Sequence, residues 1–384
     1  MKVAFYAPLK PPDHPVPSGD RQLARALLKA LRVGGHDTCL VSRFRSFDRA
    51  GDAIRQARIA DLGEKLAQRL VRRYRRSADR PDVWFTYHLY HKAPDFLGPR
   101  VSRSLDIPYV VAEASVAPAM RDGPWARGYA ASVAAIEAAS AALVLNPGDL
   151  AGVRAARGAG ALTEVLPPFL DLVPLTDAAA QTGGAPRGRP MQLITVAMMR
   201  PGNKLASYRL LAAALSLLCD LDWELVVVGD GAARSEVEAA FACIEPTRVR
   251  FAGVEPPDRV AELLQRADLF LWPAIDEVIG MAFIEAQACG LPVVGGRTRG
   301  VDSVVAAGRT GIVVPSGDAA AFAAAVRLLL QDAHARQRMG REAARYARER
   351  HGLPAAAAQF DGLLRRVIAE HKTHSATTQA VVAR

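Results

Sequence analysis

The sequence predicts an α/β protein made of two doubly wound domains, each built on a parallel sheet. Short apolar runs typical of buried strands alternate with segments of helical periodicity, and this alternation occurs in two separate series. A stretch rich in Pro, Gly and small polar residues divides the two series. The 384 residues, half of them apolar, suffice for two cores, because single domains usually contain ~100–200 residues. Both domains are therefore expected to be Rossmann-like.

The first series starts with the strand pattern VAFYAP, a loop punctuated by Pro and Gly, and the helical pattern RQLARALLKAL. Further strand patterns follow in DTCLVS, DVWFTYH and YVVAEAS, with helical segments between them. Strands that alternate with helices in this way form parallel sheets. The N-terminal domain is expected to occupy residues 1–168.

A basic amphipathic helix is predicted over residues 50–76, with an apolar face made by Leu62, Leu66, Leu70 and Tyr74 at four-residue steps. The stretch 43–76 contains eleven Arg or Lys against four Asp or Glu, in a chain of net charge +10. Two interpretations stay open: a solvated helix face, or peripheral contact with an anionic membrane. Nucleic-acid binding is not favoured, because no aromatic platform or known nucleic-acid module accompanies the charge.

The best linker candidate is residues 169–190, where strand and helix periodicity disappears. The second series then runs from LITVAMM to LFLWPA and beyond, which predicts a C-terminal domain over residues 191–353. A C-terminal helix over 354–371 is expected to pack back on the first domain. The polar tail, residues 372–384, is expected to be mobile.

No uninterrupted apolar run reaches the ~18 residues of a membrane span, and the apolar start is too short for a secretory signal. We therefore expect a cytoplasmic protein. The four cysteines are far apart in the sequence, with no CxxC pair. They are expected to be reduced thiols in the core, and no metal site is predicted.

The most informative segment is DLFLWPAIDEVIGMAFIEAQACGLPVVGG. A strand ends at Pro273, a loop carries Glu277, and a helix begins near Gly280 with Glu285 inside it. In open α/β sheets ligands bind beyond the carboxyl ends of strands, where a helix N-terminus offers free N–H groups to an anion. A carboxylate can also accept hydrogen bonds from a diol. The alternative is that both glutamates only cap and solvate a helix.

This segment, with the RGVDSVVAAGRTGIVVPSGD that follows it, closely resembles the donor site of the retaining GT-B glycosyltransferases of family 4, the glycosyl transferases group 1. The resemblance covers roughly residues 191–350. It implies that Glu285 binds the donor ribose, that Glu277 contacts the sugar hydroxyls or the reacting face, and that the amides of Gly280 and Met281 bind the phosphates. Val254 would line the base pocket.

The same resemblance points to Arg200 and Lys204 in TVAMMRPGNKLAS. Two fixed cations beside a leaving nucleoside diphosphate would stabilise the transition state more than the ground state, with no metal or other cofactor. The alternative is a solvated loop. Asp220 and Asp222 match the bare D-x-D of metal-using transferases, but they precede a strand, at the wrong edge of a sheet for a ligand site. We interpret them as turn residues.

In the first domain PVPSGDRQLARALL resembles the family's glycine loop, where Gly19 permits close backbone approach of a donor and Ser18 or Asp20 can cap the helix or meet a phosphate or acceptor. The family often carries a histidine after a strand of the form PVVxTxH. Here the matching run is IPYVVAEAS, so Glu113 stands near that place. Two substitutes are predicted for the catalytic role: Glu113, or His88 at the end of DVWFTYH.

The resemblance implies a GT-B protein with its active site in the cleft between the domains. The expected reaction is transfer of a hexosyl group, with retention, from a nucleoside diphosphate sugar to an acceptor hydroxyl in polysaccharide, lipopolysaccharide or glycolipid synthesis. A nucleotide-sugar epimerase and a non-catalytic nucleotide- or membrane-binding protein stay open as alternatives. A hydride-transfer enzyme is disfavoured, because neither domain begins with G-x-G-x-x-G. Sugar, base and acceptor, which could be lipid-linked, are not determined by the sequence.

Overall fold

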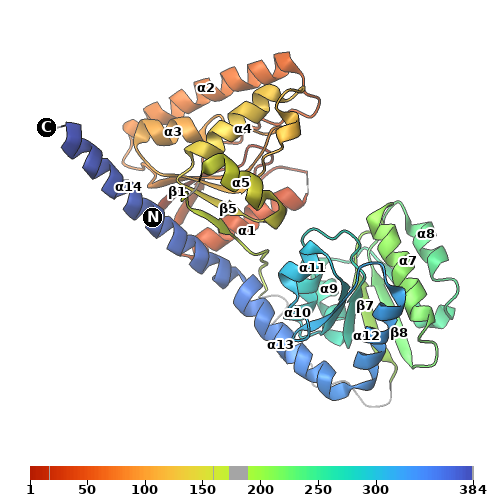
Figure 1. Cartoon of the computed structure of the whole chain (residues 1–384). Helices are drawn as coiled ribbons and strands as arrows, with labels where there is room; N and C mark the ends of the chain where they lie inside the picture. The colour runs from red at the N-terminus through yellow and green to blue at the C-terminus, as the bar shows by residue number, and fades with distance from the viewer. Residues whose placement is uncertain (17, 159, 173–188, 383–384) are drawn as a thin grey trace. The chain divides into compact units, whose positions relative to one another are not determined.

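The computed structural model describes residues 1–16, 18–158, 160–172 and 189–382. It divides into two compact units: unit 1 is Met1–Leu166 with Ala356–Arg384, and unit 2 is Pro167–Ala355 (Figure 1). Most of the predicted linker, residues 173–188, lies outside the described residues. Each unit is built on its own six-stranded sheet, as predicted.

Unit 1 contains a parallel sheet of order β2-β1-β3-β4-β5-β6. Its strands are β1 Lys2–Tyr6, β2 Asp37–Leu40, β3 Val83–Leu89, β4 Tyr109–Ala114, β5 Ala141–Val144 and β6 Thr163–Val165. Its helices are α1 Gly19–Val33, α2 Ala53–Arg75, α3 Gly98–Leu105, α4 Ala126–Ala138, α5 Leu150–Arg157 and α14 Leu353–Val382. Parallel strands end at the same edge of a sheet, so the loops after β1, β3, β4 and β5 come together there.

The prediction of which residues form the apolar face of α2 is partly wrong. The helix buries Gln56, Gly63, Ala67, Val71 and Tyr74, whereas Leu62 is 48% exposed. Four-residue steps advance about 400° around a helix, so such a stripe drifts by about 40° per step and cannot stay on one face over three steps. The buried side follows a mixture of three- and four-residue steps instead.

Unit 2 contains a second parallel sheet, of order β12-β11-β10-β7-β8-β9. Its strands are β7 Met191–Val196, β8 Trp223–Val228, β9 Val249–Gly253, β10 Leu269–Trp272, β11 Val293–Gly296 and β12 Gly311–Val314. Its helices are α7 Asn203–Ser216, α8 Arg234–Ala240, α9 Pro257–Arg266, α10 Met281–Ala288, α11 Arg299–Val304, α12 Ala319–Gln331 and α13 Ala333–His351. Asp220 and Asp222 lie in the turn before β8, as predicted.

Close backbone packing brings the ends of β7 and β8 together. A Cβ on Gly229 would overlap the carbonyl oxygen of Ala197, and one on Gly231 would overlap that of Met199. Both glycines also have positive φ, at 135° and 156°, a region that other residues rarely adopt. The glycines of VVVGDG therefore allow the two loops at this edge of the sheet to touch.

The C-terminal helix α14 packs against unit 1. The rings of Phe85 in β3 and Phe360 in α14 lie 5.8 Å apart, Gln359 donates a hydrogen bond to the Val165 carbonyl at 2.9 Å, and Arg366 forms an ion pair with Glu164. The helix continues to Val382, through residues where the sequence predicts a mobile tail. No Gly or Pro follows Gly362 to end it.

The cysteine prediction was only partly correct. All four cysteines are free thiols, but Cys39, Cys219 and Cys243 are exposed and Cys289 is half-buried. Two of the exposed thiols follow the last turn of a helix, where the amphipathic pattern no longer determines burial. No helix among the described residues is both long and apolar enough to cross a bilayer.

Candidate functional site

A cavity of about 610 Å³ opens at the carboxyl ends of the central strands of unit 2. This is where doubly wound sheets bind ligands. Six of the predicted donor-side residues line it: Lys204, Val254, Glu277, Gly280, Met281 and Glu285. The sequence therefore identifies residues, far apart in the chain, that the fold brings to one place.

The first turn of α10 has free backbone donors that face this cavity. The helix begins after Gly280, which makes no side-chain hydrogen bond to the turn, and Gly280 and Met281 both line the cavity. Gly280 has φ 77°, and a Cβ there would lie 3.0 Å from Val304 Cγ2. The Gly280 N–H bonds to Glu277, so the N–H groups from Met281 onward and the positive end of the helix dipole are the ones that suit an anion such as a diphosphate.

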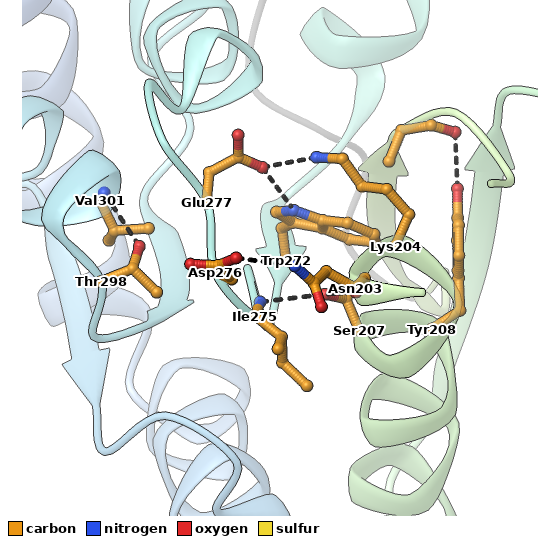
Figure 2. Close-up of polar contacts among 11 residues, drawn as sticks. Asn203, Lys204, Ser207, Tyr208, Trp272, Ile275, Asp276, Glu277, Thr298 and Val301 are labelled. Atoms are coloured by element: carbon orange, nitrogen blue, oxygen red, sulfur yellow. Dashed lines mark hydrogen bonds and ion pairs between the residues drawn. The ribbon is translucent and has the colours of Figure 1, made fainter. Parts of the chain in front are cut away.

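Lys204, Trp272 and Glu277 form a polar cluster at the wall of the cavity (Figure 2). Lys204 Nζ lies 2.6 Å from Glu277 Oε2 and 5.3 Å from the centroid of the Trp272 ring. The Trp272 indole N–H donates to the same carboxylate oxygen at 3.3 Å. Burial alone would raise the pKa of Glu277, but the bonds from Lys204, Trp272 and the Gly280 N–H outweigh it and lower that pKa.

The loop that carries Glu277 is fixed to the first turns of α7 (Figure 2). Asn203 Nδ2 donates to Asp276 Oδ2 at 2.8 Å, and the Ile275 N–H donates to Ser207 Oγ at 3.0 Å. Asp276 has φ 52° and Ala274 has φ 58°, a left-handed conformation that costs free energy in residues other than Gly. These bonds to α7 hold the strained loop in place and fix the position of Glu277.

Glu285 lies farther along α10, and among the described residues no cation offsets its burial. Burial raises its pKa to about 7, because an ionised carboxylate is poorly solvated there. Its protonated form therefore persists to a higher pH than in an ordinary glutamate. A ligand that donates hydrogen bonds to this carboxylate would favour its ionised form.

Arg200 is placed apart from the other candidates. Its side chain is exposed in the loop before α7, and it does not contribute to the cavity wall formed by the described residues. Four large apolar side chains on the cavity wall are also exposed: Met198, Val254, Val278 and Ile279. We call these four the apolar rim. Exposed apolar groups gathered at one site commonly mark a ligand-binding surface.

Gly300 in α11 supports the Glu277 loop from behind. Its N–H donates to the Glu277 carbonyl at 3.1 Å, and a Cβ there would lie 2.5 Å from that carbonyl oxygen and 2.6 Å from the carbonyl carbon of Val278. Backbone atoms cannot move aside as a flexible side chain can.

The substitution Gly300→Ala should therefore displace the Glu277 loop. We expect a loss of about 1–3 kcal/mol in the free energy of unfolding and a weaker affinity for any ligand of the cavity. Urea denaturation and titration calorimetry would measure the two effects. Gly362→Ala is the matched control, since a Cβ there meets nothing within 4 Å. Wild-type affinity in Gly300→Ala would mean that the loop position does not matter for binding.

The first-domain candidates meet at the carboxyl edge of the sheet in unit 1. His88 Nδ1 lies 3.2 Å from Asp20 Oδ1 and 3.8 Å from Glu113 Oε2. Ser18 caps α1 by accepting from the Arg21 N–H at 3.2 Å. Gly19 has open space where a Cβ would be, so no contact within the chain requires a glycine there.

Sequence reasoning missed Trp272 and Gly300. Trp272 is the last residue of a buried strand just before the candidate loop, and a large aromatic with an N–H donor at that position was a usable signal. The sequence contains no signal for Gly300, because the role of this residue depends on a tertiary contact. Among the described residues, no group of three or more His, Cys, Asp or Glu is arranged to hold a metal ion.

Comparison with solved structures identifies the architecture as GT-B. A glycosyltransferase from Rickettsia africae aligns with a TM-score of 0.70 at 13% identity, covering 95% of this chain and 98% of that chain. The Anabaena protein HepE, solved with UDP and glucose, aligns at 0.62 with 17% identity, covering 95% and 100%. Sucrose-phosphate synthase from Thermosynechococcus elongatus aligns at 0.66 with 20% identity, covering 96% and 100%. The predicted fold is confirmed.

Residues 188–346 match the family model described as Glycosyl transferases group 1. A D-inositol 3-phosphate glycosyltransferase of Corynebacterium efficiens is 39% identical over 101 residues, 26% of this chain and 24% of that protein. An N-acetyl-alpha-D-glucosaminyl L-malate synthase of Bacillus anthracis is 33% identical over 132 residues, 34% of each chain. These matches span a quarter to a third of the relatives' lengths. The predicted resemblance to the glycosyl transferases group 1 is confirmed over residues 188–346.

Proposed function

We propose that this protein is a glycosyltransferase that transfers a hexosyl group from a nucleoside diphosphate sugar to an acceptor hydroxyl, with retention of configuration. The observation that carries the proposal is the cavity of unit 2. It combines an uncapped helix N-terminus, a lysine and two carboxylates within one wall. The relative from Corynebacterium efficiens is named as a glycosyltransferase, and HepE was solved with UDP and glucose. Both findings support a nucleotide-sugar donor.

Each part of the cavity would contact a different part of the donor. The N–H groups at the start of α10 would bind the diphosphate, and Glu285 would accept hydrogen bonds from the ribose hydroxyls. The apolar rim, through Val254, would contact the base. Glu277 lies beside Lys204 and is positioned to accept hydrogen bonds from the sugar.

Catalysis would be mainly electrostatic. When the glycosidic bond breaks, negative charge grows on the departing diphosphate, and Lys204 with the α10 N–H groups would stabilise it. Lys204 is paired with Glu277, which keeps its position fixed. Arg200 would supply a second cation by the family resemblance alone, since its exposed side chain does not line the cavity formed by the described residues. This mechanism uses no metal or other cofactor.

A panel of UDP-, GDP- and ADP-sugars, each with EDTA, tests the proposal. We expect one donor to raise the melting temperature and to be hydrolysed slowly to its nucleoside diphosphate. A protein that no donor stabilises at high concentration does not bind them appreciably, and the proposal would then be rejected. Conversion of the sugar without acceptor and without diphosphate release would indicate an epimerase instead.

We also propose that unit 1 contacts an anionic membrane through α2. The outward side of this helix carries the exposed cations Arg58, Lys65, Arg69 and Arg72 together with exposed Leu62. Each cation near an anionic surface contributes about 1 kcal/mol. Reversal of charge at Lys65 and Arg69 to Glu should abolish salt-sensitive binding to phosphatidylglycerol vesicles. Binding to purely zwitterionic vesicles, or binding unchanged in the variant, would refute this contact.

A further inference from the structure

A compact polar cluster lies at the carboxyl edge of the sheet in unit 1. His88 and Glu113 are the second-to-last residues of β3 and β4, and Asp20 lies in the first turn of α1. We call these three residues the His88 cluster. Both strand-end residues have left-handed backbones, with φ 61° at His88 and 55° at Glu113.

Negative charge predominates in this cluster. Burial acts to lower the pKa of His88, but Asp20, Glu113 and Asp149 outweigh it and raise that pKa. Burial raises the pKa of Glu113; the charge of His88 and a hydrogen bond from Tyr87 act against this, and the negative charges of Asp20 and Asp149 add to it. With His88 protonated, two cations, His88 and Lys10, are set against three carboxyl groups, Asp20, Glu113 and Asp149.

Two basic residues of α1 hydrogen-bond to the loop that precedes the helix. Arg21 donates to the carbonyls of His14 and Pro15, and Arg25 donates to the carbonyl of Pro12. Lys10 is the cation that acts on Asp20, where it helps to lower the pKa. The start of α1 is also occupied, because Ser18 caps it and Asp20 adds a negative charge to its first turn.

One oxygen of the cluster has an ion-pair contact but no hydrogen bond: Glu113 Oε2 lies 3.8 Å from His88 Nδ1. Glu113 Oε2 is buried and forms no hydrogen bond with any part of the chain that the structure describes. Buried carboxylate oxygens are nearly always hydrogen-bonded, so one without a hydrogen bond at a ligand-binding edge is suited to a donor from outside the chain. Hydroxyl groups of a sugar or another polyol supply such donors, whereas a phosphate or carboxylate cannot.

We propose that Asp20, His88 and Glu113 bind the hydroxyl groups of a neutral polyol acceptor and select against acceptors that carry a phosphate or carboxylate near the reacting hydroxyl. The proposal rests on the proposed glycosyl transfer and specifies its acceptor class. Asp20 and Glu113 accept hydrogen bonds from the polyol, and His88 holds the two carboxylates in position between them. An anion at this place would face like charges.

Paired acceptors test the selection directly. The probes are myo-inositol with inositol 3-phosphate, and glucose with glucose 6-phosphate, each used with the donor that the panel identifies. We expect the wild type to prefer the neutral member of each pair in kcat/KM. In the double variant Asp20→Asn with Glu113→Gln, the neutral-to-phosphorylated ratio should fall about tenfold or more.

Glu137→Gln, an exposed carboxylate of α4, is the matched control and should leave the ratio unchanged. A wild type that prefers the phosphorylated probes, a ratio unaltered in the double variant, or failure of every neutral probe to bind or accept would overturn the inference. Because the ratio compares two acceptors with one donor, it does not depend on the donor step. Failure of donor binding and hydrolysis would instead refute the glycosyltransferase proposal itself.

Discussion

Glu285→Gln should make the ligand-free protein more stable at pH 8 while it weakens donor binding. The pKa of Glu285 is raised from 4.5 to about 7 by burial, so the unfolded chain loses this proton at lower pH than the folded protein does. Stability is therefore lost as the pH rises from about 4.5 through 7, by at most about 3 kcal/mol. A glutamine at this position has no proton to lose, so the variant keeps its stability as the pH rises.

Urea denaturation of both proteins at pH 5 and pH 8 would measure this effect. At pH 5 the carboxyl is protonated in the folded state, and we expect nearly equal stability. Equal stability at both pH values would mean that Glu285 is not held in its neutral form by burial.

Donor affinity of the wild type should increase as the pH rises, whereas its stability decreases. Hydroxyl donors favour the ionised carboxylate, so wild-type affinity should fall by up to tenfold for each pH unit below about 7. Glu285→Gln loses this charge-assisted bond, and we expect weaker and pH-independent binding by calorimetry. Full wild-type affinity in the variant would exclude Glu285 from the ribose site.

Lys204→Met should lower kcat/KM by on the order of 10²–10³-fold, the typical cost of removing one group that stabilises transition-state charge. The methionine keeps much of the side-chain length and its packing on Trp272 but removes the charge. Steady-state release of nucleoside diphosphate would measure the loss. The matched control is Arg338→Met, an exposed cation of α13, which should keep wild-type activity.

A stability effect has to be separated from this catalytic loss. Lys204→Met leaves Glu277 without its cation at 2.6 Å, so the pKa of Glu277 should rise and stability should fall by about 1–2 kcal/mol. The double variant Lys204→Met with Glu277→Gln should recover stability without recovering activity. Recovery of activity in the double variant would show that Lys204 acts only by neutralising Glu277.

The sequence predicts the two-sheet fold well because buried parallel strands such as VVVG and LFLW are strong local patterns. It also identifies Glu277 and Glu285, since the loop and helix that carry them are adjacent in the chain. The exposed position of Leu62 was missed, because helix rotation turns a four-residue stripe away from the core. Local patterns therefore predict elements better than they predict which side of an element is buried.

Contacts between distant segments are what the sequence could not provide. The support of the Glu277 loop by Gly300 joins residues on separate elements, and so does the pairing of His88 with Asp20. No periodicity or motif encodes these distances. They arise when parallel strands bring their following loops to one edge.

The division of unit 1 between two distant segments has a consequence for how the chain folds. Its core includes the contact of Phe85 with Phe360, yet all of unit 2 lies between these residues in the sequence. During synthesis, unit 2 is complete before α14 can reach its place. We therefore expect a fragment that ends before Ala356 to contain a folded unit 2 and an aggregation-prone unit 1, which makes α14 the segment that completes folding.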